Sequence, residues 1–168
     1  MATKEKIEIR KQICCIGAGY VGGPTMAVIA LNCPQYDITV VDINKERIKS
    51  WNGDLEKLPI YEPGLSEIVN KTRNKNLFFS NNIDQSIKNS EIIFMAVNTT
   101  NKIEGEGKGI ATDLSFVEDC AKRIALNSES DKIIVEKSTA PLGTAVKIRD
   151  ILKTNKKSIQ FEVISNPE

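Results

Sequence analysis

The chain has 168 residues, a length that suits one domain able to bury roughly 70% of the surface that its unfolded form exposes. Lysine and arginine number 23 against 22 aspartates and glutamates, so the net charge of +1 gives no reason to expect nucleic acid or an anionic membrane as a partner. The N-terminal residues are charged and do not have the pattern of a signal peptide, and no later apolar stretch approaches the length needed to span a bilayer. We therefore expect a cytoplasmic protein whose partner is small or local.

The side chains available for chemistry are restricted. Histidine is absent, which excludes His-dependent triads and proton relays. The four cysteines, Cys14, Cys15, Cys33 and Cys120, form no CxxC pair and no zinc-type cluster, so we expect no metal site. Cys14 and Cys15 are adjacent in an apolar run, where a strand would direct them to opposite faces. Both are predicted to be small buried residues of the core.

Apolar runs rich in Val, Ile and Phe alternate with stretches of helical spacing. The expected strands are 12–17, 37–42, 76–80, 91–97, 132–138 and 161–165, and the expected helices are 21–31, 44–51, 65–73, 83–89, 113–125 and 143–154. Because these runs are continuously apolar, helices should cover both faces of the sheet. The predicted fold is α/β, of the Rossmann type: a doubly wound, mainly parallel six-stranded sheet with helices on both faces.

Two segments interrupt this alternation. Residues 53–64 carry two prolines and two glycines between helical stretches, which predicts an ordered, non-helical crossing. Residues 98–112 follow a strand, contain three glycines and few apolar residues, and are expected to be a mobile loop near a ligand that becomes ordered when the ligand binds.

The strongest functional motif is G-x-G-x-x-G at 17–22, placed between an expected strand and an expected helix. Gly17 permits a tight turn, Gly19 lets a pyrophosphate approach the backbone, and Gly22 lets the helix pack closely on the strand. Asp42 ends the second expected strand about 20 residues later, where a carboxylate accepts from the adenosine ribose and repels a 2′-phosphate. The motif predicts NAD as cofactor, in preference to NADP. The alternative is a glycine turn beside an unrelated surface acid.

Arg47 lies at the beginning of the next expected helix. A basic group there could favour a 2′-phosphate or flank the adenine. A surface arginine on an early helical turn is also ordinary. The sequence leaves these interpretations open, and Asp42 remains the better indicator of cofactor choice.

The chain also contains a series of short sequence motifs, several of which have no role in a generic dinucleotide-binding fold. They are ICCIGAGYVGGPT, VVDIN, LPIYEPGL, NLFFS, the VNT of AVNTT, EKST and SNPE. In these phrases and their order, the chain resembles the UDP-glucose/GDP-mannose dehydrogenase family, in the style of the eukaryotic UDP-glucose 6-dehydrogenases. The resemblance covers essentially the whole chain, whereas full-length members are more than twice as long.

The resemblance implies a set of cofactor-binding positions at the carboxyl ends of strands, where open α/β sheets bind ligands. These positions are Gly17, Ala18, Gly19, Tyr20, Val21, Gly22, Asp42, Arg47, Val97, Asn98, Thr99, Thr100, Asn101, Ser138, Thr139 and Ala140. It also implies two catalytic residues, with Thr139 helping to position a water and Glu168 matching the family's acid–base carboxylate.

The family oxidises the C6 alcohol of UDP-glucose to the acid with two NAD molecules, through a covalent intermediate on a cysteine of a later GFGGSC phrase. That phrase does not occur here. We therefore expect 1–168 to be a single NAD-binding domain that ends before the family's central helix and UDP-sugar-binding domain, and to be inactive alone. The full-length family implies a homo-oligomer.

Thr100 stands where the family has a proline, which frees the loop backbone and should raise the entropic cost of ordering it on the cofactor.

Two other functions remain open. One is a stand-alone NAD-binding or interaction module without catalysis. The other is a different NAD enzyme, such as a hydroxyacyl or phosphogluconate dehydrogenase, against which YEPGL and EKST argue.

Overall fold

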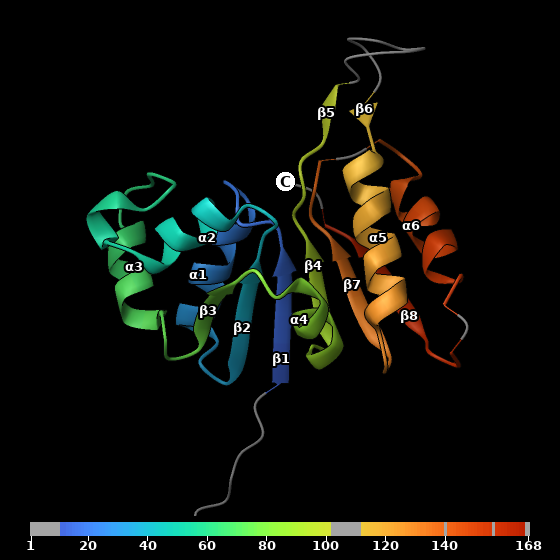
Figure 1. Cartoon of the computed structure of the whole chain (residues 1–168), viewed down its shortest axis with the longest axis horizontal. Coiled ribbons are helices and arrows are strands. Elements are labelled where there is room, and N and C mark those ends of the chain that lie inside the picture. The colour runs from blue at the N-terminus through green and yellow to red at the C-terminus, as the bar shows by residue number, and fades with distance from the viewer. Residues whose placement is uncertain (1–10, 102–111, 140, 156, 167–168) are drawn as a thin grey trace, which may run out of the picture.

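The computed structural model describes residues 11–101, 112–139, 141–155 and 157–166, with the backbone alone at 100 and 101. One sheet of six parallel strands runs through the molecule in the order β3-β2-β1-β4-β7-β8 (Figure 1). Its strands are β1 (Lys11–Ile16), β2 (Tyr36–Val41), β3 (Leu77–Ser80), β4 (Ile92–Met95), β7 (Lys132–Glu136) and β8 (Phe161–Ser165). Counted within this sheet, the order is the 3-2-1-4-5-6 of doubly wound dinucleotide folds, which confirms the predicted class.

Helices cover the two faces of the sheet in two groups, as predicted. The first group is α1 (Gly22–Asn32), α2 (Lys45–Asn52) and α3 (Leu65–Thr72), and the second is α4 (Ile83–Asn89), α5 (Ser115–Asn127) and α6 (Thr144–Leu152). Each group packs on its own cluster of buried side chains. Cys15 belongs to the first cluster and Cys14 to the second, and both are fully buried. The two adjacent cysteines therefore fill opposite faces of β1, as expected.

The two irregular segments differ partly from expectation. The crossing 53–64 is ordered but contains a short 3-10 helix, η1 (Leu55–Lys57), whose first turn is capped by the Asp54 carboxylate accepting from the Glu56 amide at 3.1 Å. The ends of the second segment pair antiparallel as β5 (Thr100–Asn101) and β6 (Thr112–Asp113). Residues 102–111, where most of the predicted mobile loop falls, lie outside the described residues.

The beginning of α5 was predicted two residues too early. Asp113 belongs to β6, and its Oδ1 accepts from the Ser115 amide at 2.9 Å, so the helix begins only at Ser115. An Asp in this position satisfies a free amide of the first helical turn, which favours a start after it.

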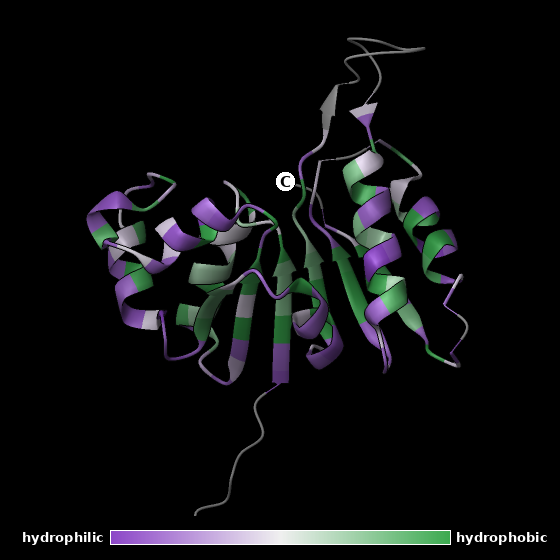
Figure 2. Ribbon diagram, in the orientation of Figure 1, coloured by the Kyte–Doolittle hydropathy of each residue, from purple (hydrophilic) through white to green (hydrophobic). Residues whose placement is uncertain are grey.

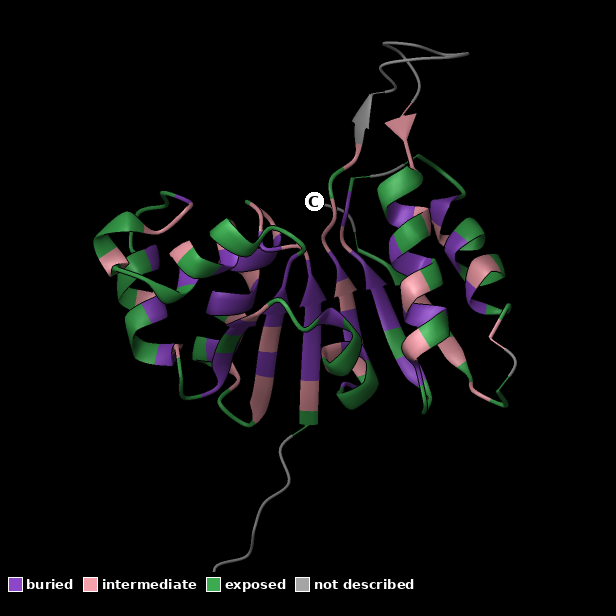
Figure 3. Ribbon diagram, in the orientation of Figure 1, coloured by how far each residue is buried: buried purple, intermediate pink, exposed green. Residues whose placement is uncertain are grey.

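Apolar strands lie between helices whose outer faces are hydrophilic (Figure 2), and the centre of the sheet is correspondingly buried (Figure 3). Because all six strands are parallel, the segments that follow them emerge at one edge of the sheet (Figure 1). Among the described helices, none combines the length and the apolar character that crossing a bilayer requires. The edge at the strand ends is where the predicted site residues gather.

Candidate functional site

The turn between β1 and α1 leaves no room for a side chain at two of its three motif glycines. Gly17 has a φ of +112°, which L side chains rarely adopt, and a Cβ there would overlap the carbonyl oxygen of Ala96 after β4. A Cβ at Gly22 would overlap the carbonyl oxygen of Gly17. The structure thus places the first and third glycines of the motif where only glycine fits.

Gly19 is different, because a Cβ built there meets no atom within 4 Å. Packing within the chain therefore does not require glycine at this position. The backbone amides of Gly19, Tyr20 and Val21 donate no hydrogen bond to any residue that the structure describes. They precede the 11-residue helix α1, whose N-terminal end carries partial positive charge. Open space beside unused amides at a helix N-terminus suits an anion.

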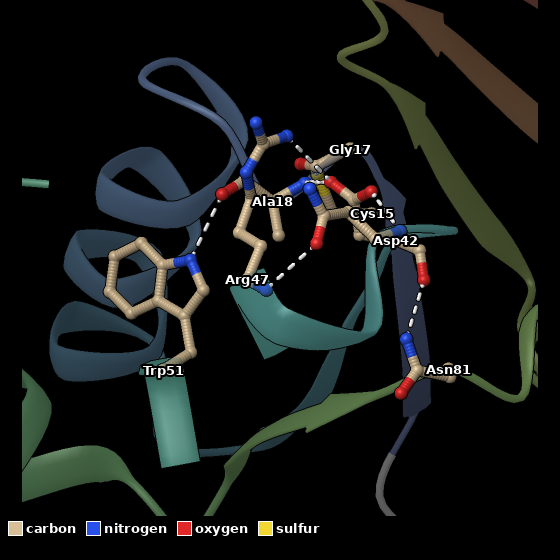
Figure 4. A network of polar contacts seen from close by, with 8 residues as sticks. Cys15, Gly17, Ala18, Asp42, Arg47, Trp51 and Asn81 are labelled. Atoms are coloured by element: carbon tan, nitrogen blue, oxygen red, sulfur yellow. Dashed lines mark hydrogen bonds and ion pairs between the residues drawn. The ribbon is translucent and has the colours of Figure 1, made fainter. Parts of the chain in front are cut away.

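Asp42, directly after β2, joins this turn to the beginning of α2 (Figure 4). Its side chain is buried, with 7% of the residue exposed. Oδ2 accepts from the Ala18 amide at 2.9 Å, and Oδ1 accepts from the Asn44 amide at 2.8 Å. Hydrogen bonds from backbone amides to a carboxylate are among the stronger ones in proteins. Asp42 therefore fixes the glycine turn in addition to standing where the predicted ribose contact falls.

Arg47 lies on the first turn of α2 and pairs with the same carboxylate, its Nη1 donating to Asp42 Oδ2 at 3.2 Å. The guanidinium is part-exposed while the carboxylate is buried. The charge of Asp42 is thereby matched within the chain. None of the interpretations left open by the sequence included this pairing.

The loops after β4 and β7 meet beside the glycine turn and are joined by two hydroxyl groups. Ser138 is buried, and its Oγ donates to the Val97 carbonyl at 2.7 Å. Thr99 Oγ1 donates to the Thr139 carbonyl at the same distance. The structure thus brings Val97, Thr99, Ser138 and Thr139 together, with Asn98 exposed between them. Ala140, Glu168 and the side chains of Thr100 and Asn101 lie outside the described residues.

Glu136, the last residue of β7, is a buried carboxylate that sequence reasoning did not single out. Ser165 Oγ donates to its Oε2 at 2.9 Å, and the Asn166 amide donates to its carbonyl oxygen at 2.9 Å. Its Oε1 has no hydrogen-bond partner among the described residues. The sequence signal that could have identified Glu136 was an acidic residue at the end of the apolar run in IIVEKS.

None of the four cysteines is placed to react at this edge of the sheet: three are buried, and Cys33 lies away from it. Burial raises the pKa of Cys14 and Cys15 well above the usual range, and that of Cys120 to about 12. Cys33 follows the C-terminal end of α1, whereas the site lies at the N-terminal end of that helix. In the described parts of the chain, no group of three or more His, Cys, Asp or Glu side chains converges as metal ligands would.

A parallel sheet of this order, with a glycine-rich turn leading into α1, defines a Rossmann-type dinucleotide-binding domain. The chain belongs to the UDP-glucose/GDP-mannose dehydrogenase family, since residues 11–168 match its NAD binding domain. The resemblance noted in the sequence is thereby confirmed.

Among curated proteins, the chain is 55% identical to UDP-glucose 6-dehydrogenase 1 of Glycine max over 157 residues, which is 94% of this chain and 32% of that protein. It is 54% identical to UDP-glucose 6-dehydrogenase 1 of Arabidopsis thaliana over the same shares of the two chains. The chain therefore spans about a third of the length of these relatives.

Solved structures agree on the fold. A UDP-glucose dehydrogenase from Pyrobaculum islandicum superposes with a TM-score of 0.81 at 24% identity, covering 99% of this chain and 38% of that one. A GDP-mannose dehydrogenase from Pseudomonas aeruginosa, solved as a ternary complex, gives 0.79 at 25% identity, covering 93% and 36%.

Proposed function

We propose that this chain binds NAD across the carboxyl ends of β1, β2, β4 and β7, as the cofactor-binding part of a UDP-glucose 6-dehydrogenase. The observation that carries the proposal is the contrast among the three glycines of the motif. Gly17 and Gly22 are crowded by backbone atoms, while the space beside Gly19 is open and bordered by unused amides. A ligand's pyrophosphate accounts for a glycine that the chain's own packing does not need.

In this proposal the turn Gly17, Ala18, Gly19, Tyr20, Val21, Gly22 holds the pyrophosphate and Asp42 holds the adenosine ribose. A carboxylate offers about four acceptor positions. Three are used by the Ala18 amide, the Asn44 amide and Arg47, which leaves one for a ribose hydroxyl. Arg47, already paired with Asp42, would flank the adenosine rather than bind a 2′-phosphate.

The nicotinamide end would lie against the two loops joined by hydroxyl groups. The residues proposed there are Val97, Asn98, Thr99, Thr100, Asn101, Ser138, Thr139 and Ala140. NAD would supply the hydride acceptor for oxidation of the sugar C6 alcohol. Thr139 is proposed to help position a water and Glu168 to move the proton, both on the strength of the family resemblance.

The substrate class is proposed from the relatives, which are named UDP-glucose 6-dehydrogenases. We propose that residues 1–168 act as one NAD-binding domain and that the full-length protein works as a homo-oligomer. All four cysteines are free. Free thiols suit a reducing compartment, which supports the proposed cytoplasmic setting.

Cofactor choice gives the first test. Calorimetric titration of this chain should show tighter binding of NAD than of NADP, because a 2′-phosphate would meet the buried carboxylate of Asp42. Asp42→Asn also disturbs the glycine turn. Its effect on cofactor choice is therefore measured as the ratio of NAD affinity to NADP affinity. Equal or tighter binding of NADP by the unaltered chain would overturn the assignment of Asp42.

Turnover separates the proposal from a non-catalytic NAD-binding module. We expect the 168-residue chain to bind NAD without sustained reduction of it in the presence of UDP-glucose. Its three buried thiols have raised pKa values and are not available as nucleophiles, and Cys33 lies at the far end of α1 from the site. The measurement is absorbance of the reduced nicotinamide. Sustained turnover that Glu168→Gln abolishes would show that the chain alone is a working enzyme. NAD binding that no added nucleotide sugar affects, even in a full-length protein, would favour a non-catalytic module.

A further inference from the structure

Trp51, the only tryptophan of the chain, lies on α2 and is completely buried behind the glycine turn. Its indole Nε1 donates to the Ala18 carbonyl oxygen at 2.9 Å (Figure 4). The ring stacks on Phe79 with centroids 4.7 Å apart and planes inclined by 6°. The ring also lies so close to α1 that a Cβ at Gly23 would overlap it. Packing against Phe79 and α1 therefore fixes the indole independently of its hydrogen bond to the turn.

The hydrogen bond from Trp51 sets the orientation of one peptide group. In a trans peptide the C=O and the N–H point in opposite directions. The Ala18 carbonyl points inward to the indole, so the Gly19 amide of the same peptide group points away from it. That amide donates to no described residue and borders the open space beside Gly19.

The preceding peptide group is fixed separately, because the Ala18 amide donates to Asp42 Oδ2 at 2.9 Å. Ala18 is itself fully buried, and no other described donor reaches its carbonyl oxygen. A buried carbonyl that lost the indole N–H would be left unsatisfied, which favours rotation of the peptide toward water or another donor. Rotation would also turn the Gly19 amide out of its present direction.

We propose that Trp51 is a positioning residue for anion binding: its indole N–H holds the Ala18–Gly19 peptide so that the Gly19 amide faces the pyrophosphate of the dinucleotide. The inference rests on the proposed function, since it assigns the direction of an amide at the proposed NAD site. It adds a residue of α2 that does not itself touch the ligand.

The test replaces Trp51 by β-(benzothien-3-yl)alanine, which keeps a bicyclic aromatic ring and has no N–H. The unique tryptophan makes this replacement site-specific. We expect ADP and NAD to bind about five- to tenfold more weakly, while adenosine, which has no phosphate, binds within about twofold of the unaltered chain. Without ligand, the Gly19 amide resonance should shift in ¹H–¹⁵N spectra, and adding ADP should move it less than in the unaltered chain.

Two further variants separate loss of the indole N–H from loss of its stacking partner. Trp51→Phe also removes the donor, and if folded it should show the same selective loss for ADP. Phe79→Leu removes the stacking partner but keeps the indole N–H, so it should leave the ratio of ADP to adenosine affinity unchanged. Equal loss of both ligands in the Trp51 variants, or no loss of ADP, would overturn the positioning role alone. An unaltered chain that binds neither NAD nor ADP would overturn the proposed function as well.

Discussion

Two regions of the site are held in different ways. The glycine turn, residues 17–22, is fixed by buried interactions: the Gly17 amide donates to the Val41 carbonyl at 2.8 Å, Asp42 holds the Ala18 amide, and Trp51 holds the Ala18 carbonyl. The loop pair, residues 97–99 and 138–139, is joined by the hydroxyls of Thr99 and Ser138. The first region is fixed by close backbone packing together with the buried side chains of Asp42 and Trp51. The second depends on two hydroxyl groups that can be removed one at a time.

The largest loss of stability is expected for Gly17→Ala in the glycine turn. The new Cβ would overlap the Ala96 carbonyl, and the backbone would be strained at a φ of +112°. Strain and overpacking together should lower the free energy of unfolding by about 2 to 5 kcal/mol. Urea denaturation measures it. A loss below about 1 kcal/mol would show that this turn is not fixed by backbone packing.

A smaller effect is expected for Ser138→Ala in the loop pair. The variant removes a buried hydroxyl that donates to the Val97 carbonyl at 2.7 Å, which should cost about 1 kcal/mol in the free energy of unfolding. Thr99→Val is the matched control, because its hydroxyl bond is exposed and should cost less. If either variant destabilised the chain as much as Gly17→Ala, the contrast between the two regions would be wrong.

A smaller loss of stability again is expected for Arg47→Met, which supports the first region only through Asp42. The Arg47 side chain is 39% exposed, and Asp42 keeps its two backbone amides without it. Loss of this part-exposed ion pair should cost about 0.5 to 1 kcal/mol, and the cost should diminish in high salt. Thermal denaturation at low and high salt measures both. A cost above about 2 kcal/mol would place the guanidinium, rather than the amides, as the main support of Asp42.

The fold was largely predictable because its signals are local. Continuous apolar runs identified all six strands of the main sheet, and helical spacing placed six helices within one or two residues. The pairing of β5 with β6 was not predicted. Thr100–Asn101 and Thr112–Asp113 are two-residue strands without an apolar alternation, so nothing in their sequence distinguishes them from loop.

The site was predictable to the extent that it depends on a motif. The glycines and Asp42 follow a fixed spacing, but the partners of Asp42 and the role of Trp51 depend on contacts between distant residues. Trp51 reaches Ala18 across 33 positions of the chain, and Gly23, which makes room for its ring, looks in the sequence like an extra glycine beside the motif. Glu136 was missed for the same reason, because its partner Ser165 lies on another strand.

Gly19→Ala tests most directly whether the space beside Gly19 is reserved for a ligand's pyrophosphate. The added methyl meets no atom of the chain, so the free energy of unfolding should change by less than about 0.5 kcal/mol, in contrast to Gly17→Ala. Calorimetry should show NAD and ADP bound at least about tenfold more weakly, since the methyl would occupy the position of the pyrophosphate. An alanine variant that is stable and binds NAD as tightly as the unaltered chain would show that this space does not hold the pyrophosphate.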